Sequence, residues 1–362
     1  MLKYPKQRVQ VAAKGKKTMT ERADEQTVLV TGASGYIAGH CILQLLQQGY
    51  RVRGTLRTPS RAVALRQALL PHVDPGDRLT LVTADLLTDD GWAEAAAGCD
   101  AVLHVASPNE EKEPDDELAW IAPARDGTLR VLQAAADAGA RRVVMTSSIA
   151  AVWPGNDPRG RVFSEADWAN TAVKIGAYAR SKTEAERAAW AFLEELPPAS
   201  GLELAVINPG YVVGPMLDDR VPTSAAVVSK LLYAEVPGCF DIGFNLVDVR
   251  DVAGAHLLAM THPDAAGKRF ICSSGYLTSQ EVALALNEAF GERGYRVPTR
   301  MLPNIVLRLA GLFDSTVRRA LPELGREVVL STELLRETLD WQPRPPEEAV
   351  IAMAESLVAL DA

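Results

Sequence analysis

Tyr178 and Lys182 lie four residues apart in the run Y-A-R-S-K, inside a segment from Ala177 to Leu196 that predicts a helix. Four residues are about one helical turn, so the phenol and the ammonium should share a face. A nearby lysine cation favours the phenolate and therefore lowers the tyrosine pKa from its usual value of about 10. A tyrosine tuned in this way can protonate a carbonyl oxygen while hydride reaches the carbon. The pair predicts the acid/base centre of an oxidoreductase.

Three hydroxyl residues, Thr146, Ser147 and Ser148, stand at the end of a predicted strand from Val143 to Ser147. In a parallel sheet, ligands bind at the edge formed by the carboxyl ends of the strands. A serine at this edge could face the substrate and hold its oxygen by a hydrogen bond. Thr146 is expected to lie beside the cofactor.

Residues 28–39, V-L-V-T-G-A-S-G-Y-I-A-G, predict a strand, a tight glycine turn and the start of a helix. Gly32 can adopt the conformation that the turn needs, and Gly35 lets a pyrophosphate approach the main chain. The helix that begins near Tyr36 offers free N–H groups and a positive dipole end to phosphates. The cofactor contacts predicted in this turn are Gly32, Ser34, Gly35, Tyr36 and Ile37.

The end of the second predicted strand selects between the two nicotinamide cofactors. An acidic residue there would bind the adenosine ribose, but the sequence reads G-T-L-R-T-P-S-R, which places Arg57 and Arg61 there. A guanidinium can stack on adenine and bind a 2′-phosphate with two hydrogen bonds. We therefore expect NADPH rather than NADH. Further predicted cofactor contacts, at the ends of later strands, are Asp85, Leu86, Val105, Ala106 and Ser107.

Apolar strand-like runs alternate with helical segments up to residue 208, which is the pattern of a parallel sheet covered by helices on both faces. The predicted strands are Thr27–Thr31, Arg51–Leu56, Leu79–Thr83, Ala101–Val105, Val143–Ser147 and Leu204–Asn208. The predicted helices are Tyr36–Gln48, Arg61–Leu70, Trp92–Ala97, Leu118–Ala138 and Ala177–Leu196. The sequence therefore predicts an α/β fold, with a Rossmann-type doubly wound parallel sheet over residues 25–208.

The pattern changes after Asn208, where Pro and Gly break the chain and short elements follow. We expect residues 209–362 to form a smaller, mostly helical substrate-binding lobe with segments that return to the sheet. In this part, Arg269–Ser273 predicts a strand and Ser279–Phe290 a helix. Asp251 is expected to cap a helix that follows the run L-V-D-V-R.

The 362 residues carry a net charge of −8, which argues against nucleic acid as the main partner. No apolar run has the length of a membrane span. The four cysteines are far apart and the five histidines lack metal-ligand spacing, so we expect buried free thiols and no metal site. These features predict a cytoplasmic monomer or homodimer.

Residues 1–24 are polar and basic and are expected to be a disordered tail outside the fold. Met19 could be the natural start, with an upstream extension before it. An organellar transit peptide is the alternative.

Six motifs occur in order: T-G-A-S-G-Y-I-A, V-L-H-V-A-S-P, T-S-S-I-A-A-V, Y-A-R-S-K-T-E-A-E, I-N-P-G-Y-V-V-G-P and V-D-V-R-D-V-A-G-A-H. Together they resemble an extended short-chain dehydrogenase/reductase, and within that family the dihydroflavonol 4-reductase, cinnamoyl-CoA reductase and aldehyde reductase group. The resemblance implies a Ser-Tyr-Lys triad formed by Ser148, Tyr178 and Lys182. It also implies contacts with the nicotinamide from Asn208, Pro209 and Val212.

The loops past the sheet edge are mostly apolar, which favours an aromatic or aliphatic carbonyl substrate. The segment between Ser148 and Tyr178 shows no clear match to the plant enzymes, so a flavonoid-type substrate is not implied. Two enzymatic alternatives remain on the same fold, a sugar-nucleotide epimerase or dehydratase and a 3β-hydroxysteroid dehydrogenase. An alternative of another class is a non-catalytic dinucleotide-sensing regulator.

Overall fold

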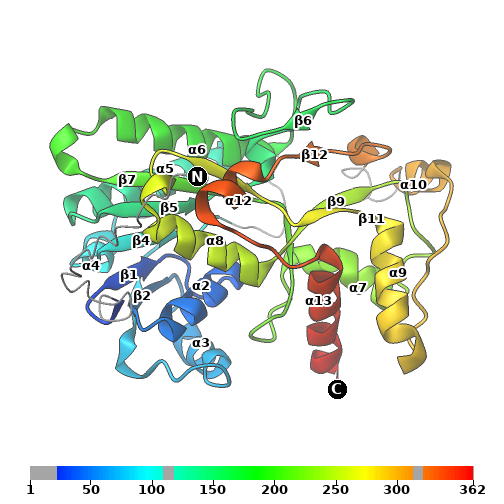
Figure 1. The fold of residues 1–362 in the computed structure, drawn as a ribbon, viewed down its shortest axis with the longest axis horizontal. Coiled ribbons are helices and arrows are strands. Elements are labelled where there is room, and N and C mark those ends of the chain that lie inside the picture. The colour runs from blue at the N-terminus through cyan, green and yellow to red at the C-terminus, as the bar shows by residue number, and fades with distance from the viewer. Residues whose placement is uncertain (1–22, 109–117, 313–320, 362) are drawn as a thin grey trace, which may run out of the picture.

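The fold is that of a computed structural model, which describes residues 23–108, 118–312 and 321–361 (Figure 1). Residues 1–22 of the predicted tail lie outside the described residues. No helix in the described ranges is long and apolar enough to cross a membrane. All four cysteines are buried and free.

A parallel sheet of seven strands runs through the molecule in the order β10-β7-β5-β4-β1-β2-β3. Its strands are β1 (Thr27–Val30), β2 (Arg51–Leu56), β3 (Leu79–Thr83), β4 (Ala101–His104), β5 (Arg142–Thr146), β7 (Glu203–Pro209) and β10 (Arg269–Cys272). Central strands such as β4 and β5 are buried along their whole length, which explains their continuous apolar sequence. The predicted doubly wound sheet is confirmed.

Helices cover both faces of this sheet and form two separate apolar cores. One face carries α2 (Tyr36–Gln47), α3 (Arg61–Leu69), α8 (Val249–Thr261) and α12 (Glu333–Leu339). The other carries α4 (Trp92–Ala96), α5 (Leu118–Asp137) and α6 (Ala177–Glu195). Because β10, α8 and α12 all follow residue 208, the second half of the chain contributes to the sheet layer.

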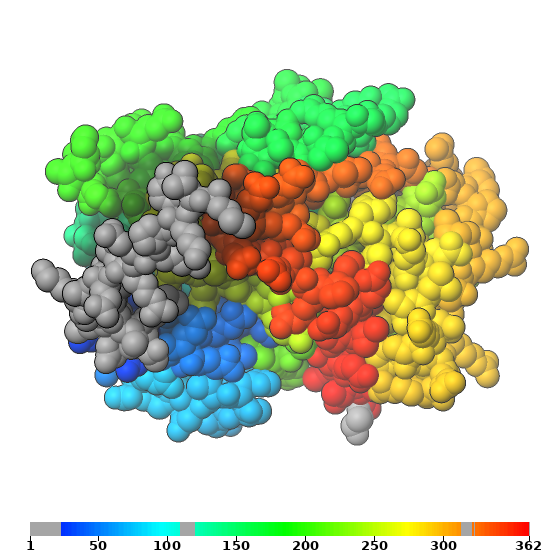
Figure 2. All heavy atoms as spheres, in the orientation of Figure 1, coloured from blue at the N-terminus to red at the C-terminus, as the bar shows by residue number. Residues whose placement is uncertain are grey.

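A third core lies in a smaller lobe beside the sheet. Its sheet has the order β11-β9-β8 and consists of β8 (Tyr211–Val213), β9 (Gly243–Asp248) and β11 (Gly275–Thr278). Its helices are α7 (Ala226–Leu232), α9 (Ser279–Phe290), α10 (Asn304–Ala310) and α13 (Pro346–Asp361). A short pair of strands, β6 (Val162–Phe163) and β12 (Val329–Leu330), completes the fold. Figure 2 shows α12 and α13, in orange and red, between the blue α2 region and the yellow α9.

The N-cap of helix α8 lies three residues before the predicted one. The carboxylate of Asp248 accepts a hydrogen bond from the Arg250 backbone N–H at 2.7 Å and is the N-cap. Asp251 is instead buried, and its carboxylate accepts the backbone N–H of Arg344 at 2.7 Å. The prediction was wrong because β9 leads directly into α8, so the cap is the last residue of the strand.

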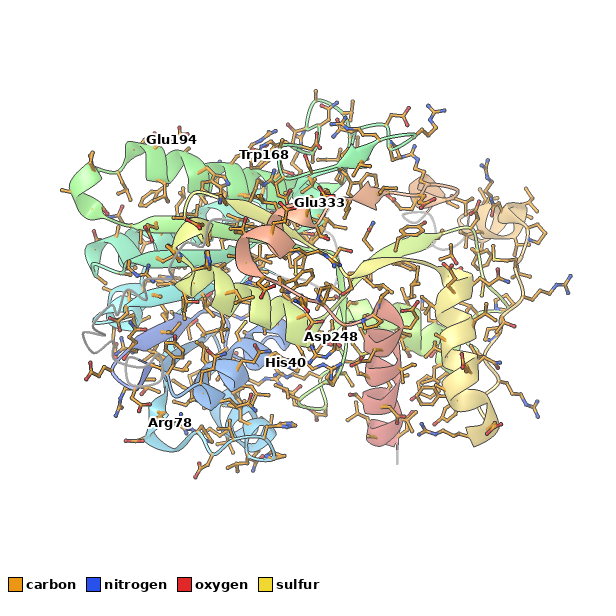
Figure 3. All side chains as sticks on the ribbon, viewed as in Figure 1. His40, Arg78, Trp168, Glu194, Asp248 and Glu333 are labelled. Atoms are coloured by element: carbon orange, nitrogen blue, oxygen red, sulfur yellow. The ribbon has the colours of Figure 1, made fainter. Side chains whose placement is uncertain are left out.

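One face of α2 holds the smaller lobe against the sheet. The Tyr36 hydroxyl donates to the Gly214 carbonyl at 2.8 Å, and His40 Nε2 lies 2.9 Å from the Pro215 carbonyl. Gln44, one further turn along, donates to the Arg250 carbonyl of α8 at 2.7 Å. These three side chains are spaced four residues apart and so share one face. Figure 3 shows His40 at this junction.

Candidate active site

The carboxyl ends of the parallel strands bring most of the predicted site residues to one edge of the sheet. The glycine turn follows β1, Val105 to Ser107 follow β4, and Ser147 and Ser148 follow β5. Asn208 and Pro209 end β7, which is hydrogen-bonded to β5. Strand β1 lies beside β4 and β4 beside β5. A ligand along this edge would therefore meet the glycine turn, the small residues and the serines in turn.

The turn after β1 has the geometry of a phosphate-binding loop. Gly32 has φ +66°, the left-handed conformation that the turn was expected to need. A Cβ at this position would lie 3.0 Å from Ala106 Cα, so the neighbouring chain also excludes a side chain. Gly35 is the N-cap of α2, and as a glycine it has no side chain to occupy the first N–H groups. Those groups fit an anionic ligand.

Arg57 and Arg61 flank the end of β2 and the start of α3, and both are exposed. Neither guanidinium pairs with a carboxylate among residues 23–108, 118–312 and 321–361. Asp85 lies on the neighbouring strand end and accepts the Leu87 backbone N–H at 3.0 Å. Leu86 packs against Gly127 of α5. The two free cations fit a 2′-phosphate at this end of the site.

A buried hydrogen-bond chain fixes the segment from Val105 to Ser107. The Thr31 hydroxyl accepts the Ala106 backbone N–H at 3.0 Å and lies 3.0 Å from His104 Nδ1. His104 Nε2 lies 3.3 Å from the Thr128 hydroxyl, which itself donates to a carbonyl of α5. His104 Nε2 therefore carries the proton and Nδ1 accepts. Burial, followed by the charge of Lys182, lowers the His104 pKa to about 3, so the ring is neutral.

Tyr178 is at the start of α6 and interacts with Ser148. The Ser148 hydroxyl caps the next turn by accepting the Ala150 backbone N–H at 3.1 Å. Burial raises the Tyr178 pKa, and the hydrogen bond from the Ser148 side chain opposes that rise. The prediction that Lys182 lowers the Tyr178 pKa was therefore wrong. The pKa is raised, because desolvation of the phenol is the largest effect. The Tyr178 residue is nevertheless 47% exposed, so its ring remains accessible to a ligand.

Lys182, one turn after Tyr178, is buried at 8% exposure. Burial lowers its pKa to about 8, and the charge of Glu186 acts in the opposite direction. Glu186 lies a further turn along α6 and is fully buried. The sequence analysis did not assign Glu186 a role, although it is the last residue of the motif Y-A-R-S-K-T-E-A-E. Its spacing from Lys182 was the available signal.

Asn208 connects this helix to the serine loop. Its Nδ2 donates to Glu186 Oε2 at 2.8 Å and to the Ser148 carbonyl at 3.2 Å. Thr146 has its hydroxyl 2.7 Å from His256 Nε2, while His256 Nδ1 lies 2.7 Å from the Val252 carbonyl. Nδ1 therefore carries the histidine proton and the Thr146 hydroxyl donates to Nε2. The Thr146 hydroxyl proton is thus donated to His256 and not to a ligand.

Aromatic side chains surround Tyr178. The Trp120 ring of α5 lies edge-on, with centroids 6.4 Å apart, and its indole N–H is buried without a partner in the described part of the chain. Tyr211 of β8 is 42% exposed and packs on Phe244 with centroids 5.3 Å apart. Tyr178 helps to raise the Tyr211 pKa, behind the larger effect of burial, so the two phenols are close. Trp120 was not predicted, because its partner is 58 residues away in the sequence.

The sheet order, the glycine turn and the Tyr-Lys pair at the same edge define a dinucleotide-binding protein of the short-chain dehydrogenase/reductase class. The chain belongs to the NAD dependent epimerase/dehydratase family, whose sequence profile matches residues 28–272. The resemblance stated from the motifs is therefore confirmed.

Reductases are among its similar proteins. Cinnamoyl-CoA reductase 1 of Petunia hybrida is 39% identical over 281 residues, which cover 76% of this chain and 80% of that one. Dihydroflavonol 4-reductase of Zea mays is 34% identical, with 77% and 78% covered. The structure resembles yeast methylglyoxal/isovaleraldehyde reductase Gre2 in its complex with NADPH. Their TM-score is 0.78 at 27% identity, and 93% of this chain and 99% of that chain are covered.

Proposed function

We propose that the protein reduces an apolar or aromatic aldehyde or ketone to an alcohol with NADPH, using Ser148, Tyr178 and Lys182. The observation that carries the proposal is the interaction of the Ser148 and Tyr178 side chains at the sheet edge, with Lys182 one turn away. The similarity to oxidoreductases supports carbonyl reduction in general. The proposal adds the three residues and the kind of substrate.

The cofactor is NADPH. The Gly32 turn and the open first turn of α2 fit its pyrophosphate, and Arg57 and Arg61 fit its 2′-phosphate. Val105, Ala106 and Ser107, together with Asn208, Pro209 and Val212, are proposed to lie along the nicotinamide half. The Tyr36 side chain is used at the junction between the lobes, so Tyr36 would contribute its backbone N–H.

Bound NADPH supplies a hydride to the carbonyl carbon. Ser148 holds the substrate oxygen by a hydrogen bond, and Tyr178 donates its phenolic proton to the same oxygen. Burial raises the Tyr178 pKa, so the phenol is protonated and ready to donate at neutral pH. The Lys182 cation then stabilises the phenolate that this donation leaves.

The side chains near Tyr178 support an aromatic or large apolar substrate. Trp120 lies edge-on to Tyr178 and Tyr211 packs on Phe244, and aromatic rings favour such edge-on or offset contacts with other rings. The unpartnered Trp120 N–H offers one donor to a substrate oxygen. A pocket of this kind favours apolar contact with a few directing polar groups.

The second candidate is sugar-nucleotide epimerisation or dehydration, which the name of the matched family favours. Both reactions could use the same Tyr and Lys. The test mixes the protein with NADPH and a panel of aromatic and aliphatic aldehydes and ketones and follows nicotinamide absorbance. We expect turnover of at least one aromatic carbonyl compound and none of UDP-glucose. NADPH binding without turnover of any carbonyl compound would contradict the proposal, and conversion of UDP-glucose would favour the second candidate.

A further inference from the structure

Glu186 is a fully buried carboxylate that the proposed chemistry does not use. It follows Tyr178 by eight residues and Lys182 by four on α6, so the three side chains share one helical face. Its Oε2 accepts the Ser147 hydroxyl at 2.6 Å and Asn208 Nδ2 at 2.8 Å. A carboxylate that only accepts can satisfy all of these donors at once.

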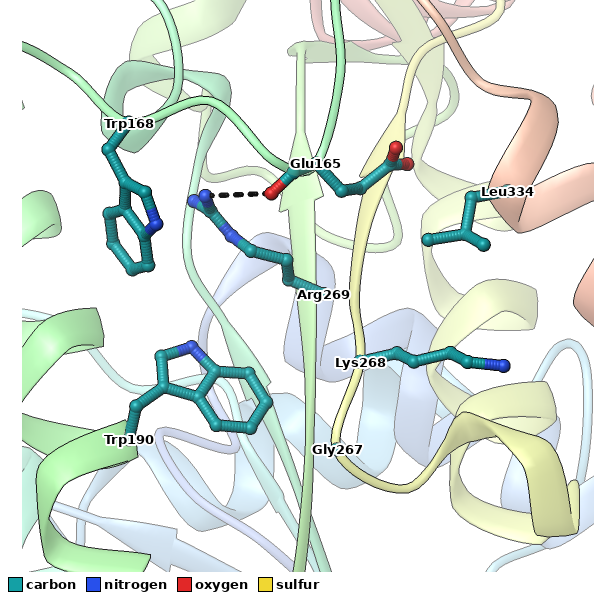
Figure 4. Close-up of a pocket in the computed structure, with 7 residues that line it drawn as sticks. All are labelled: Glu165, Trp168, Trp190, Gly267, Lys268, Arg269 and Leu334. Carbon is teal, nitrogen blue, oxygen red and sulfur yellow. Dashed lines mark hydrogen bonds between the residues drawn. The ribbon is translucent and has the colours of Figure 1, made fainter. Parts of the chain in front are cut away.

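The counter-ion of Glu186 comes from the edge strand. Arg269 of β10 is buried, and its Nε lies 2.7 Å from Glu186 Oε1. The guanidinium also donates to the Asp167 carbonyl at 2.7 Å and lies 3.8 Å from the Trp168 ring centroid. Figure 4 shows the Arg269 guanidinium beside Trp168, with Trp190 below them, and all three residues line a hollow of about 360 Å³. Glu186 therefore pairs with Arg269 from the sheet, and its charge also acts on Lys182, which lies one turn earlier on its own helix.

The hydrogen bonds of Glu186 lead to the loop that carries Ser148. Ser147 precedes Ser148 in the chain, and Asn208 donates to the Ser148 carbonyl at 3.2 Å. The amide orientation of Asn208 follows from its surroundings, because both of its near partners are acceptors and only Nδ2 can donate. The carboxylate is thus linked to Ser148 in two ways. It accepts from the side chain of the preceding residue, Ser147, and it accepts from Asn208, which also donates to the Ser148 carbonyl.

We propose that Glu186 is a positioning residue for the reaction: it orients Ser148 through Ser147 and Asn208, with Arg269 as its counter-ion, and its charge acts on the Lys182 ammonium one helical turn away. This inference rests on the proposed roles of Ser148, Tyr178 and Lys182. If the opposite charges of Glu186 and Arg269 cancel at Lys182, the pair between α6 and β10 is structural only and its removal leaves the Lys182 pKa unchanged.

The charged and titratable groups that face Lys182 determine what a titration would report. On its own helix these are Tyr178 and Glu186, and from β4 the neutral ring of His104 is close enough to sense its charge. The other charged residues on packed elements have partners elsewhere: Arg125 with Asp126 on α5, and Glu203 of β7 with Arg141 and Arg142. Among the described residues, Glu186 is accordingly the anion whose charge raises the Lys182 pKa against the effect of burial.

The test measures the charge of Lys182 directly, without cofactor or turnover. The protein is labelled with ¹³C at lysine Cε, the Lys182 signal is assigned by its loss in Lys182→Met, and its chemical shift is followed against pH. The variant is Glu186→Gln combined with Arg269→Met, which removes both members of the buried pair, so that Arg269 is not left as an unpaired buried charge. We expect the Lys182 midpoint to fall by about one pH unit or more. The alkaline limb of kcat/KM should move to lower pH by a similar amount.

Glu203→Gln is the matched control, because it breaks an ion pair between the sheet and Arg142 that lies away from Lys182. It should leave the Lys182 midpoint unchanged. An unchanged midpoint in a folded Glu186→Gln/Arg269→Met protein would overturn the inference, whatever its loss of stability. If that protein does not fold, Arg269→Met alone is used: the unbalanced carboxylate should raise the Lys182 midpoint, and no rise would overturn the inference.

The two proposals fail in different ways. If the wild-type protein reduces no carbonyl compound but the Lys182 midpoint shifts as expected, the proposed function is wrong and the Glu186–Lys182 interaction remains. If the wild-type protein is an active reductase and neither the midpoint nor the alkaline limb shifts, Glu186 is a structural residue only.

Discussion

Neighbouring hydroxyl residues have different tasks at the end of β5. Ser148 interacts with the Tyr178 phenol, whereas Ser147 donates to buried Glu186 at 2.6 Å. The resemblance assigns the reaction to Ser148, and the proposed function keeps that assignment, because Ser147 is already hydrogen-bonded to Glu186. Removing the hydroxyl from one serine or the other therefore separates a proposed role in the reaction from a role in binding Glu186.

Ser148→Ala should reduce kcat by about 10²–10³-fold, since it removes a donor to the substrate oxygen. Ser147→Ala should reduce the free energy of unfolding by about 1 kcal/mol, because Glu186 loses one of its donors, and should affect kcat less. Steady-state kinetics and urea unfolding of both variants measure these effects. A larger loss of kcat in Ser147→Ala than in Ser148→Ala would show that the proposed assignment to Ser148 is wrong.

Arg57→Ala tests the cofactor preference. A charge-assisted hydrogen bond contributes about 1.5–3 kcal/mol, so NADPH should bind about 10- to 100-fold more weakly. NADH, which has no 2′-phosphate, should bind nearly as before. Fluorescence titration with both cofactors provides the measurement, and an unchanged ratio of the two dissociation constants would show that Arg57 does not bind the phosphate. Arg51, an exposed residue at the start of the same strand, is the control position.

Helix α2 has two functions along its length. Its open first turn follows the glycine loop, and Tyr36 and His40 bind the smaller lobe, while Gln44 on the same face binds α8. The cofactor site and the junction between the lobes are therefore parts of one rigid element. The sequence predicted the first function from G-x-x-G spacing but not the second, because the lobe residues that α2 contacts are about 175 positions later.

Gly32→Ala tests the turn before α2. A positive φ costs a non-glycine residue about 1–2 kcal/mol, and here the new Cβ would also meet Ala106. Gly98→Ala is the matched control, with a similar φ of +68° and open space around its Cβ. We expect Gly32→Ala to be the less stable variant in urea unfolding and to lose NADPH affinity, while Gly98→Ala keeps it. Equal stability and NADPH affinity of the two variants would contradict this account of the turn.

At the scale of the whole molecule, the sheet was predictable because each buried strand is a short apolar run that ends at a glycine or a polar residue. The Tyr-Lys pair was predictable because both members lie on one helix. The Glu186–Arg269 pair and Trp120 were not, because their partners come from other elements and only the fold brings them together. The start of α8 was misplaced for a local reason, since two aspartates at Asp248 and Asp251 can each serve as a cap.

Three buried histidines connect the layers of the molecule and should make it sensitive to acid. Burial lowers the pKa of His104 to about 3, and the pKa values of His40 and His256 to about 4. In the unfolded chain a histidine has a pKa of about 6.5, so the unfolded state binds protons at a higher pH than the folded state. The free energy of unfolding therefore keeps its full value above about pH 6.5 and decreases as the pH falls below it. At pH 5 each of the three histidines should have reduced the free energy of unfolding by about 2 kcal/mol.

Urea unfolding at pH 7 and pH 5 checks this expectation. His256→Gln should show a smaller difference between the two pH values than the wild type, although it is less stable at pH 7. His72→Gln, at an exposed position after α3, is the control and should keep the wild-type difference. Equal stability of the wild type at both pH values would show that the three rings are not held neutral by the fold.

The central claim is that Tyr178 donates the proton, and Tyr178→Phe tests it most directly. We predict that kcat for an aromatic aldehyde falls by about 10²–10⁴-fold while the dissociation constant for NADPH changes little. Tyr211→Phe, which removes the neighbouring exposed phenol, should keep most of the activity. Retained turnover in Tyr178→Phe, or an equal loss of turnover and NADPH binding, would contradict the account.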